Sequence, residues 1–158
     1  MPTKSTRLAE FMPYRLSVTS NGVSDMIAKQ YRQRFGLKIP EWRVMAILGD
    51  AGGLTQRQLV GATRMDKVAI NRACKVLEDR GLLARSPNAR DGRSHHLGLT
   101  PSGREMFEEI MPLALEMEKR VFSCLSQREF HLLKELLGKV DENTAALEAE
   151  GAATARRA

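Results

Sequence analysis

Apolar residues in the first third of the chain recur at helical intervals, with polar residues between them. In the first helical stretch they are four or seven positions apart: Leu16, Val23, Ile27, Tyr31 and Phe35. Proline fits the first turn of a helix, and glycine fits the position just after its end. The pattern therefore predicts one helix from near Pro13 to Gly36 and a second from Pro40 to Gly52-Gly53.

The next stretch carries the polar signals of two short helices joined by a turn. Thr55 and Gln58 form a Thr-x-x-Gln capping box, in which each side chain bonds the backbone N–H of the other residue. Asp66 can cap the following helix, which should end at Gly81. Its apolar residues are spaced to face inward together: Ile70, Ala73, Cys74 and Leu77.

The pattern then changes to short β segments. Residues 82–86 predict a strand, residues 87–94 form a turn-rich tip, and residues 95–99 alternate as a second strand. A two-stranded ribbon directly after a helix-turn-helix is a wing.

The last third returns to helical spacing. Thr100-Pro101 starts a helix that should kink near Pro112, and Ser126 with Glu129 forms a second capping box. From about Ala149 little order is expected. The whole pattern predicts a mostly α fold with a small β-wing: a winged helix-turn-helix of about six helices with a two- or three-stranded antiparallel wing.

The distribution of charge favours the middle of the chain as a segment that faces a polyanion. Residues 54–100 hold nine Lys or Arg against four Asp or Glu, a net charge of +5. Residues 101–158 have a net charge of −3, while the whole chain carries +6. The chain has no apolar run long enough to cross a membrane and no signal-peptide core, so a cytoplasmic protein is expected.

The basic segment contains residues suited to DNA. If the apolar line of its second helix faces inward, five residues face outward: Lys67, Val68, Asn71, Arg72 and Lys75. Asn and Arg offer paired hydrogen bonds to adenine and guanine edges in the major groove. Arg90 and Arg93 at the wing tip can enter a minor groove. Asp91 is expected to orient Arg93 through a charged hydrogen bond rather than touch DNA.

Four motifs resemble those of the MarR family of bacterial winged-helix regulators. They are Pro40-Glu41-Trp42-Arg43-Val44, the run 66–85 ending in LEDRGLLAR, Asp91-Gly92-Arg93, and Leu99-Thr100-Pro101-Ser102-Gly103. The resemblance covers roughly residues 12–147. It implies an interlocked homodimer that represses transcription from a palindromic operator and is released by a small aromatic or anionic ligand.

The sequence pattern and the resemblance together predict a division of the chain. Residues 1–10 would form a flexible arm, residues 11–36 and 101–148 a helical dimerisation region, residues 37–100 the DNA-binding lobe, and residues 149–158 a flexible tail.

The resemblance further implies two sets of site residues. The expected DNA-binding residues are Thr55, Gln56, Lys67, Val68, Ala69, Asn71, Arg72, Lys75, Arg85, Arg90, Asp91 and Arg93. The expected ligand-binding residues are Arg15, Ser24, Trp42, Met45, Phe107 and Met111.

Other functions stay open beside this one. Cys74 or Cys124 could sense oxidants, although the sequence gives neither an activating cation. A weakly specific architectural DNA-binding protein would share the basic lobe. His95 and His96 are adjacent in a strand and point to opposite faces, so a shared metal ion is disfavoured. The sequence has no nucleophile–base set or phosphate loop, so neither an enzyme nor a cofactor is expected.

Overall fold

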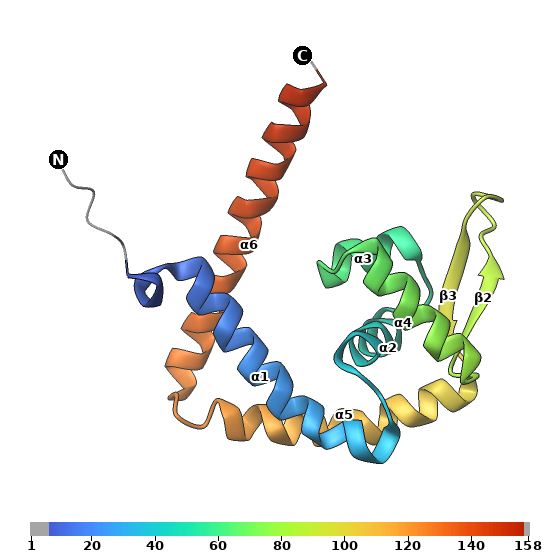
Figure 1. Ribbon diagram of the computed structural model, residues 1–158, viewed down its shortest axis with the longest axis horizontal. Helices are drawn as coiled ribbons and strands as arrows, with labels where there is room; N and C mark the ends of the chain where they lie inside the picture. Colours follow the sequence, from blue (N-terminus) through green and yellow to red (C-terminus); the bar gives the residue numbers. More distant parts are fainter. Residues whose placement is uncertain (1–6, 157–158) are drawn as a thin grey trace. The chain divides into compact units, whose positions relative to one another are not determined.

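The computed structural model describes residues 7–156, which form six α-helices, a short 3₁₀ turn and a three-stranded sheet (Figure 1). In chain order these are η1 Leu8–Glu10, α1 Met12–Phe35, α2 Ile39–Ala51, β1 Leu54–Thr55, α3 Gln56–Thr63, α4 Lys67–Asp79, β2 Leu83–Pro87, β3 His95–Leu99, α5 Pro101–Val121 and α6 Gln127–Ala155. The mostly α winged helix-turn-helix fold is confirmed. In this part of the chain, no helix is both long and apolar enough to span a membrane.

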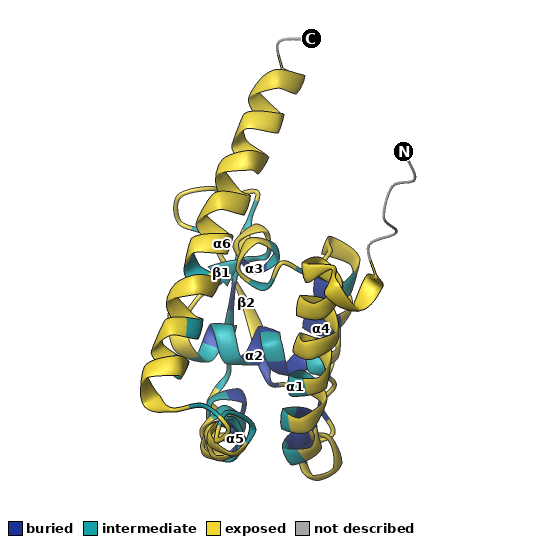
Figure 2. Ribbon diagram, turned by 90° about the vertical axis from the view of Figure 1, so that its left-hand side faces the viewer, coloured by how far each residue is buried: buried dark blue, intermediate teal, exposed yellow. Residues whose placement is uncertain are grey.

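The chain divides into two compact units, of which the first ends at Glu118 and the second begins at Lys119. The first unit holds the core (Figure 2). Its largest fully buried side chains come from α1 to α5, from the loop between α1 and α2, and from β3: Tyr31, Leu37, Val44, Met45, Leu48, Leu59, Ile70, Cys74, Leu77, Leu97 and Ile110.

The first two helices begin and end close to the expected residues. Pro13 lies in the first turn of α1, and Gly36 closes the helix in the left-handed conformation at φ 65°. Glu41 is buried in the first turn of α2, where its carboxylate accepts a hydrogen bond from the Lys38 backbone N–H at 2.8 Å. Gly52 ends α2 at φ 79°. Both glycines therefore occupy positions that other residues adopt at a cost.

Helices α3 and α4 form the predicted helix-turn-helix. The Thr55–Gln58 capping box is present, with the Gln58 N–H donating to Thr55 Oγ1 at 3.2 Å and the Thr55 N–H donating to Gln58 Oε1 at 2.8 Å. Asp66 caps α4 by accepting from the Ala69 N–H at 2.9 Å. The four apolar residues expected to face inward on α4 are all buried.

The sheet has the strand order β1-β3-β2, and both pairings are antiparallel. Leu97 of β3 pairs with Leu54 on one side and Arg85 on the other. Because β1 continues directly into α3, backbone hydrogen bonds connect the wing to the start of the helix-turn-helix.

Three expectations about the ends of elements need correction. Leu8–Glu10 form a 3₁₀ turn instead of a flexible arm; the rest of that expectation, residues 1–6, lies outside the described residues. Helix α6 continues to Ala155, so the tail expected from residue 149 is wrong over that range; residues 157–158 are also outside the described part. Leu82 precedes β2 rather than starting it.

The last two helices begin at the expected caps. Thr100 Oγ1 accepts from the Gly103 N–H at 3.1 Å, and Ser126 Oγ accepts from the Glu129 N–H at 3.3 Å. The hydrogen bonds from Ser126 lower the pKa of the Glu129 carboxyl, as expected for a charged cap. Helix α5 runs through Pro112 without interruption, and the kink near it stays a prediction.

Candidate nucleic-acid interface

The outer face of α4 carries the residues expected to read DNA. Lys67, Val68, Asn71, Arg72 and Lys75 are all exposed, because the buried residues of the same helix occupy the opposite side. Val68 is 56% exposed, and an apolar side chain at this position is suited to contact a thymine methyl group. Ala69 differs, since it is half-buried and its N–H is occupied by the Asp66 cap.

Two of the expected DNA-binding cations are held by carboxylates. Lys75 Nζ donates to Asp79 Oδ1 at 2.8 Å one turn along α4, and this bond raises the pKa of Lys75. Arg85 on β2 forms a two-pronged pair with Glu78 of α4, through Nε to Oε1 and Nη2 to Oε2, the latter at 3.1 Å. The pair raises the pKa of Arg85 and joins the wing to the end of α4.

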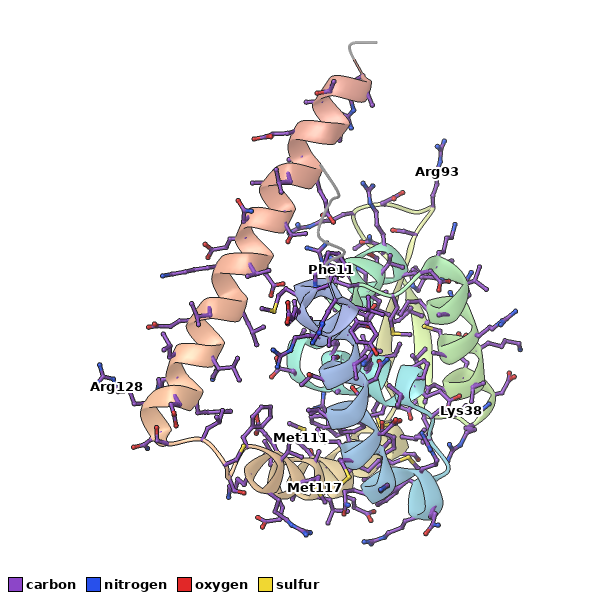
Figure 3. The ribbon with its side chains drawn as sticks, turned by 60° about the vertical axis from the view of Figure 1, so that its left-hand side comes forward. Phe11, Lys38, Arg93, Met111, Met117 and Arg128 are labelled. Atoms are coloured by element: carbon purple, nitrogen blue, oxygen red, sulfur yellow. The ribbon has the colours of Figure 1, made fainter. Side chains whose placement is uncertain are left out.

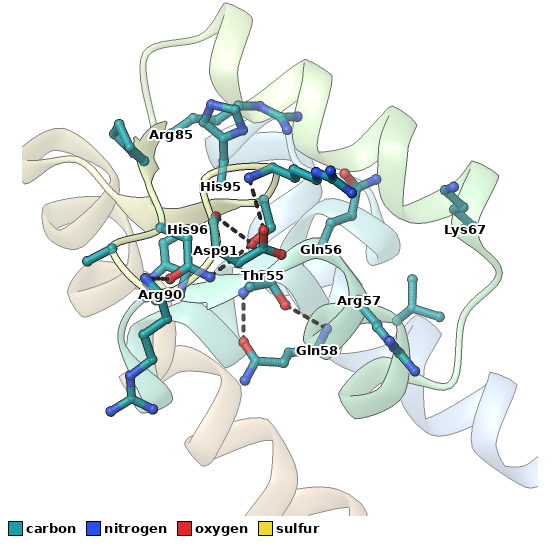
Figure 4. Close-up of a pocket in the computed structure, with 17 residues that line it drawn as sticks. Thr55, Gln56, Arg57, Gln58, Lys67, Arg85, Arg90, Asp91, His95 and His96 are labelled. Atoms are coloured by element: carbon teal, nitrogen blue, oxygen red, sulfur yellow. Dashed lines mark hydrogen bonds between the residues drawn. The ribbon is translucent and has the colours of Figure 1, made fainter.

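A concave surface lies between α3, the start of α4 and the wing (Figure 4). We call it the wing groove; its hollow is about 1110 Å³. Its lining includes five basic side chains: Arg57, Lys67, Arg85, Arg90 and Arg93. Thr55 and Gln56 lie in it at the N-terminal end of α3, where backbone N–H groups and the helix dipole favour anions. Gln56 Nε2 is buried there without a hydrogen-bond partner among the described residues.

The wing tip is organised by its own hydrogen bonds. Asn88 Nδ2 donates to Ser94 Oγ at 2.9 Å, and the Arg90 N–H donates to Asn88 Oδ1 at 3.0 Å. Asp91 Oδ1 accepts from the backbone N–H of Arg93 at 3.0 Å. The expected bond from Asp91 to the Arg93 side chain is therefore replaced by one to its backbone. The Arg93 side chain extends outward from the tip (Figure 3).

The residues expected to bind a ligand are divided between core and surface. Trp42 and Met45 are buried, and Trp42 packs against Tyr31 and Phe107 with ring centroids 5.4 and 6.1 Å apart. Ser24 Oγ accepts a hydrogen bond from Arg43 at 3.1 Å. Of the remaining two residues, Arg15 on α1 is exposed and Met111 on α5 is partly buried. The structure thus leaves the ligand assignment a prediction.

The two cysteines have opposite environments. Cys74 is fully buried, and burial raises the pKa of its thiol to about 11, which leaves little reactive thiolate near neutral pH. Cys124 is exposed in the turn after α5. Within residues 7–156, no cluster of three His, Cys, Asp or Glu side chains could hold a metal ion.

Sequence reasoning missed two contributors to this surface. Arg57 lines the wing groove from the first turn of α3; its place directly after Gln56 was the available signal. Strand β1 has only two residues, and its pairing partner lies more than forty positions away, at Leu97 and His96. No local pattern could have revealed it.

A helix-turn-helix with an exposed polar second helix, followed by a basic wing, defines a winged-helix DNA-binding protein. Comparison with known proteins narrows this class. The sequence model of the MarR family matches residues 35–94. An HTH-type transcriptional repressor of Mycobacterium tuberculosis is 31% identical over 106 residues, which cover 65% of this chain and 76% of that protein.

Two solved structures are similar to this chain in fold. A probable transcriptional regulator from Pseudomonas aeruginosa has 29% identity and a TM-score of 0.73, covering 85% of this chain and 99% of that chain. BpsR of Bordetella bronchiseptica, whose DNA binding is regulated by 6-hydroxynicotinic acid, has 25% identity and a TM-score of 0.76, covering 86% and 96%. The chain belongs to the MarR family. It is a DNA-binding transcriptional regulator and not an enzyme.

Proposed function

We propose that this regulator is a ligand-responsive repressor that binds a palindromic operator as a homodimer. The observation that carries the proposal is the joint placement of an exposed polar face on α4 and a basic groove beside the wing. A helix of this kind fits the major groove, while the wing reaches the adjacent minor groove. The M. tuberculosis relative is itself named a repressor.

Within this proposal the residues have separate tasks. Asn71 and Arg72 read base edges, with Val68 and Ala69 close to them on α4. Thr55, Gln56, Lys67 and Lys75 contact phosphates. Arg90 and Arg93 enter the minor groove, and Asp91 holds the tip. Arg85 reaches DNA only if its pair with Glu78 opens, so its first task is to join the wing to α4.

Dimerisation is supported by apolar surface that a single chain leaves uncovered. Near the start of α1, Phe11, Met12 and Val18 are 49, 60 and 49% exposed. Helix α6 has no buried residue along its 29 positions and exposes five large apolar side chains: Leu132, Leu136, Leu137, Val140 and Leu147. Exposed apolar area of this kind marks an interface. Residues 11–36 and 101–148 are therefore proposed to pair two copies, with residues 37–100 as the DNA-binding lobe.

A small-molecule effector is proposed from the similar protein BpsR and from the residues of α1, α2 and α5 that are expected to bind a ligand. BpsR responds to 6-hydroxynicotinic acid, an aromatic acid. Here Arg15 could pair with a carboxylate, and Trp42, Met45, Phe107 and Met111 could pack on a ring beside Ser24. A panel of aromatic carboxylates, tested for release of bound DNA by wild type and by Arg15→Ala, examines this part. Release by none of them would contradict it.

The DNA-binding proposal is tested by selecting sites from a random duplex library with the wild-type protein. We expect enrichment of a two-fold symmetric sequence, which a weakly specific architectural protein would not produce. Arg93→Ala should weaken binding and reduce the salt dependence by about one unit of slope. Asn71→Ala or Arg72→Ala should relax base preference at one position by about 1–3 kcal/mol.

Arg156→Ala is the matched control, because it removes one exposed Arg from the C-cap of α6, a position outside residues 37–100 and residues 101–148. It should leave the affinity for the selected site unchanged. Equal enrichment of all sequences by the wild type would contradict the proposal of a specific operator.

A further inference from the structure

Arg80 connects the C-terminal end of α4, the helix proposed to read DNA, to the C-terminal end of α1. The residue is the C-cap of α4, and its guanidinium donates from Nη2 to the Phe35 carbonyl at 2.7 Å and from Nη1 to the Gly36 carbonyl at 3.1 Å. We call these two bonds the Arg80 bridge. They join residues 44 and 45 positions apart in the sequence.

The bridge has a clear electrostatic basis. The last carbonyls of a helix have no partner within it and carry the negative end of the helix dipole. Gly36 turns the chain into the left-handed conformation, and its carbonyl and that of Phe35 both face the Arg80 side chain. The planar guanidinium can bond two carbonyls at once, whereas the ammonium of a lysine is a single point charge on a flexible stem.

The other contacts of α4 constrain less strongly how far the helix shifts along its axis and how far it rotates about that axis. The helix packs through one apolar line, Ile70, Ala73, Cys74 and Leu77, and apolar packing has no direction. The Asp66 cap is internal to the turn and α4, and the Lys75–Asp79 pair lies wholly within the helix. Directional bonds to other elements occur at its C-terminal end, through Glu78 to the wing and Arg80 to α1.

We infer that Arg80 is a positioning residue for DNA binding: the Arg80 bridge fixes α4 relative to α1, so that the reading face is presented in one orientation. This rests on the proposed function, in which α4 reads DNA and two copies bind one site. A helix of 13 residues is about 20 Å long, so a small tilt at Arg80 displaces Asn71 and Arg72 relative to base edges. In a dimer, the same bridge sets the distance between the two reading helices.

The test uses the full-length protein and the duplex selected by the wild type, together with duplexes whose half-site spacing is one base pair shorter or longer. Arg80→Lys and Arg80→Ala are compared with the control Arg156→Ala. Arg156 is also an exposed Arg at the C-cap of a helix, here α6, and it lies outside residues 37–100 and outside the residues proposed to pair two copies. Affinity, salt dependence and melting temperature are measured for each variant.

We expect both Arg80 variants to bind the selected duplex about tenfold or more weakly and to discriminate less between spacings, while Arg156→Ala behaves as wild type. The slope of affinity against salt should stay that of the wild type, because no phosphate contact is removed.

Three results would overturn the inference. The first is wild-type affinity and wild-type spacing preference in both Arg80 variants. The second is a salt slope reduced by about one unit, because that would indicate a direct phosphate contact. The third is an equal loss of affinity on every duplex that a lower folded fraction explains. Failure of the wild type to select any site would instead contradict the proposed function.

Discussion

At the scale of single residues, Asp91 has the most sharply defined task. Its carboxylate accepts the backbone N–H of Arg93 at 3.0 Å, in the pattern of an Asx turn. Such a bond requires an oxygen at this position but not a negative charge. This bond fixes the backbone of Arg93, while its side chain extends outward from the tip (Figure 3).

Asp91→Asn should therefore keep operator affinity near that of the wild type, because the amide oxygen can accept the same N–H. Asp91→Ala should weaken binding, since the tip loses the bond that orders it. Affinities for the selected duplex measure both. A loss in Asp91→Asn as large as in Asp91→Ala would show that the charge itself matters, as the sequence alone had suggested.

Residue-level signals of this kind were predictable where partners are close in sequence. The caps at Thr55, Asp66 and Ser126 each join residues three positions apart, so their spacing revealed them. Arg80 and Arg85 could not be assigned in the same way. Their partners are fixed by how elements pack, and the sequence placed Arg85 among DNA contacts without its partner Glu78.

At the scale of elements, the start of α5 packs closely against the backbone between α4 and β2. Thr100 Oγ1 donates to the Gly81 carbonyl at 2.7 Å, and the Thr100 N–H donates to the Leu82 carbonyl at 3.1 Å. A Cβ on Gly103 would lie 2.0 Å from the Leu82 carbonyl oxygen. The start of α5 is thus pressed onto the backbone that leads into the wing.

Gly103→Ala should lower the free energy of unfolding by about 3 kcal/mol, because the clash is with backbone that has no room to move. Gly61→Ala is the matched control on α3, where nothing lies within 4 Å, and it should raise stability by about 0.5–1 kcal/mol. Thermal or denaturant unfolding compares the two. Similar melting temperatures for both would contradict the close approach.

The lengths of α6 and β1 could not be predicted from the local sequence pattern. The sequence predicts little order from about Ala149, but α6 continues through Glu150-Gly151-Ala152-Ala153 to Ala155. Alanine has the highest helix propensity, and its effect summed over these residues outweighs one glycine. The length of β1, by contrast, depends on the presence of β3 and has no cause within Leu54–Thr55 itself.

At the scale of the whole molecule, the exposed apolar side chains of α6 are the main support for the proposed dimer. Leu136 is 48% exposed and Val140, one turn later, is 52% exposed. Leu136→Asp should destabilise a dimer by roughly 3 kcal/mol, since a two-fold interface contains the change twice.

Sedimentation should give a mass near twice 17.7 kDa for the wild type and a shift toward the single chain for this variant. Lys134→Asp, on the opposite side of the helix, is the control and should remain dimeric. A wild type of single-chain mass, or a dimer unaffected by Leu136→Asp, would contradict the role of α6.

The self-contained bonding of the wing tip has a consequence for how such a protein can change over generations. The bonds of Asn88, Arg90, Asp91 and Arg93 join tip residues to one another, and the strand register is held separately by β1, β3 and β2. Insertions or substitutions in the tip leave that register intact. Under the proposed function, mutation of the tip can therefore tune how long the protein resides on its operator without altering which bases α4 selects.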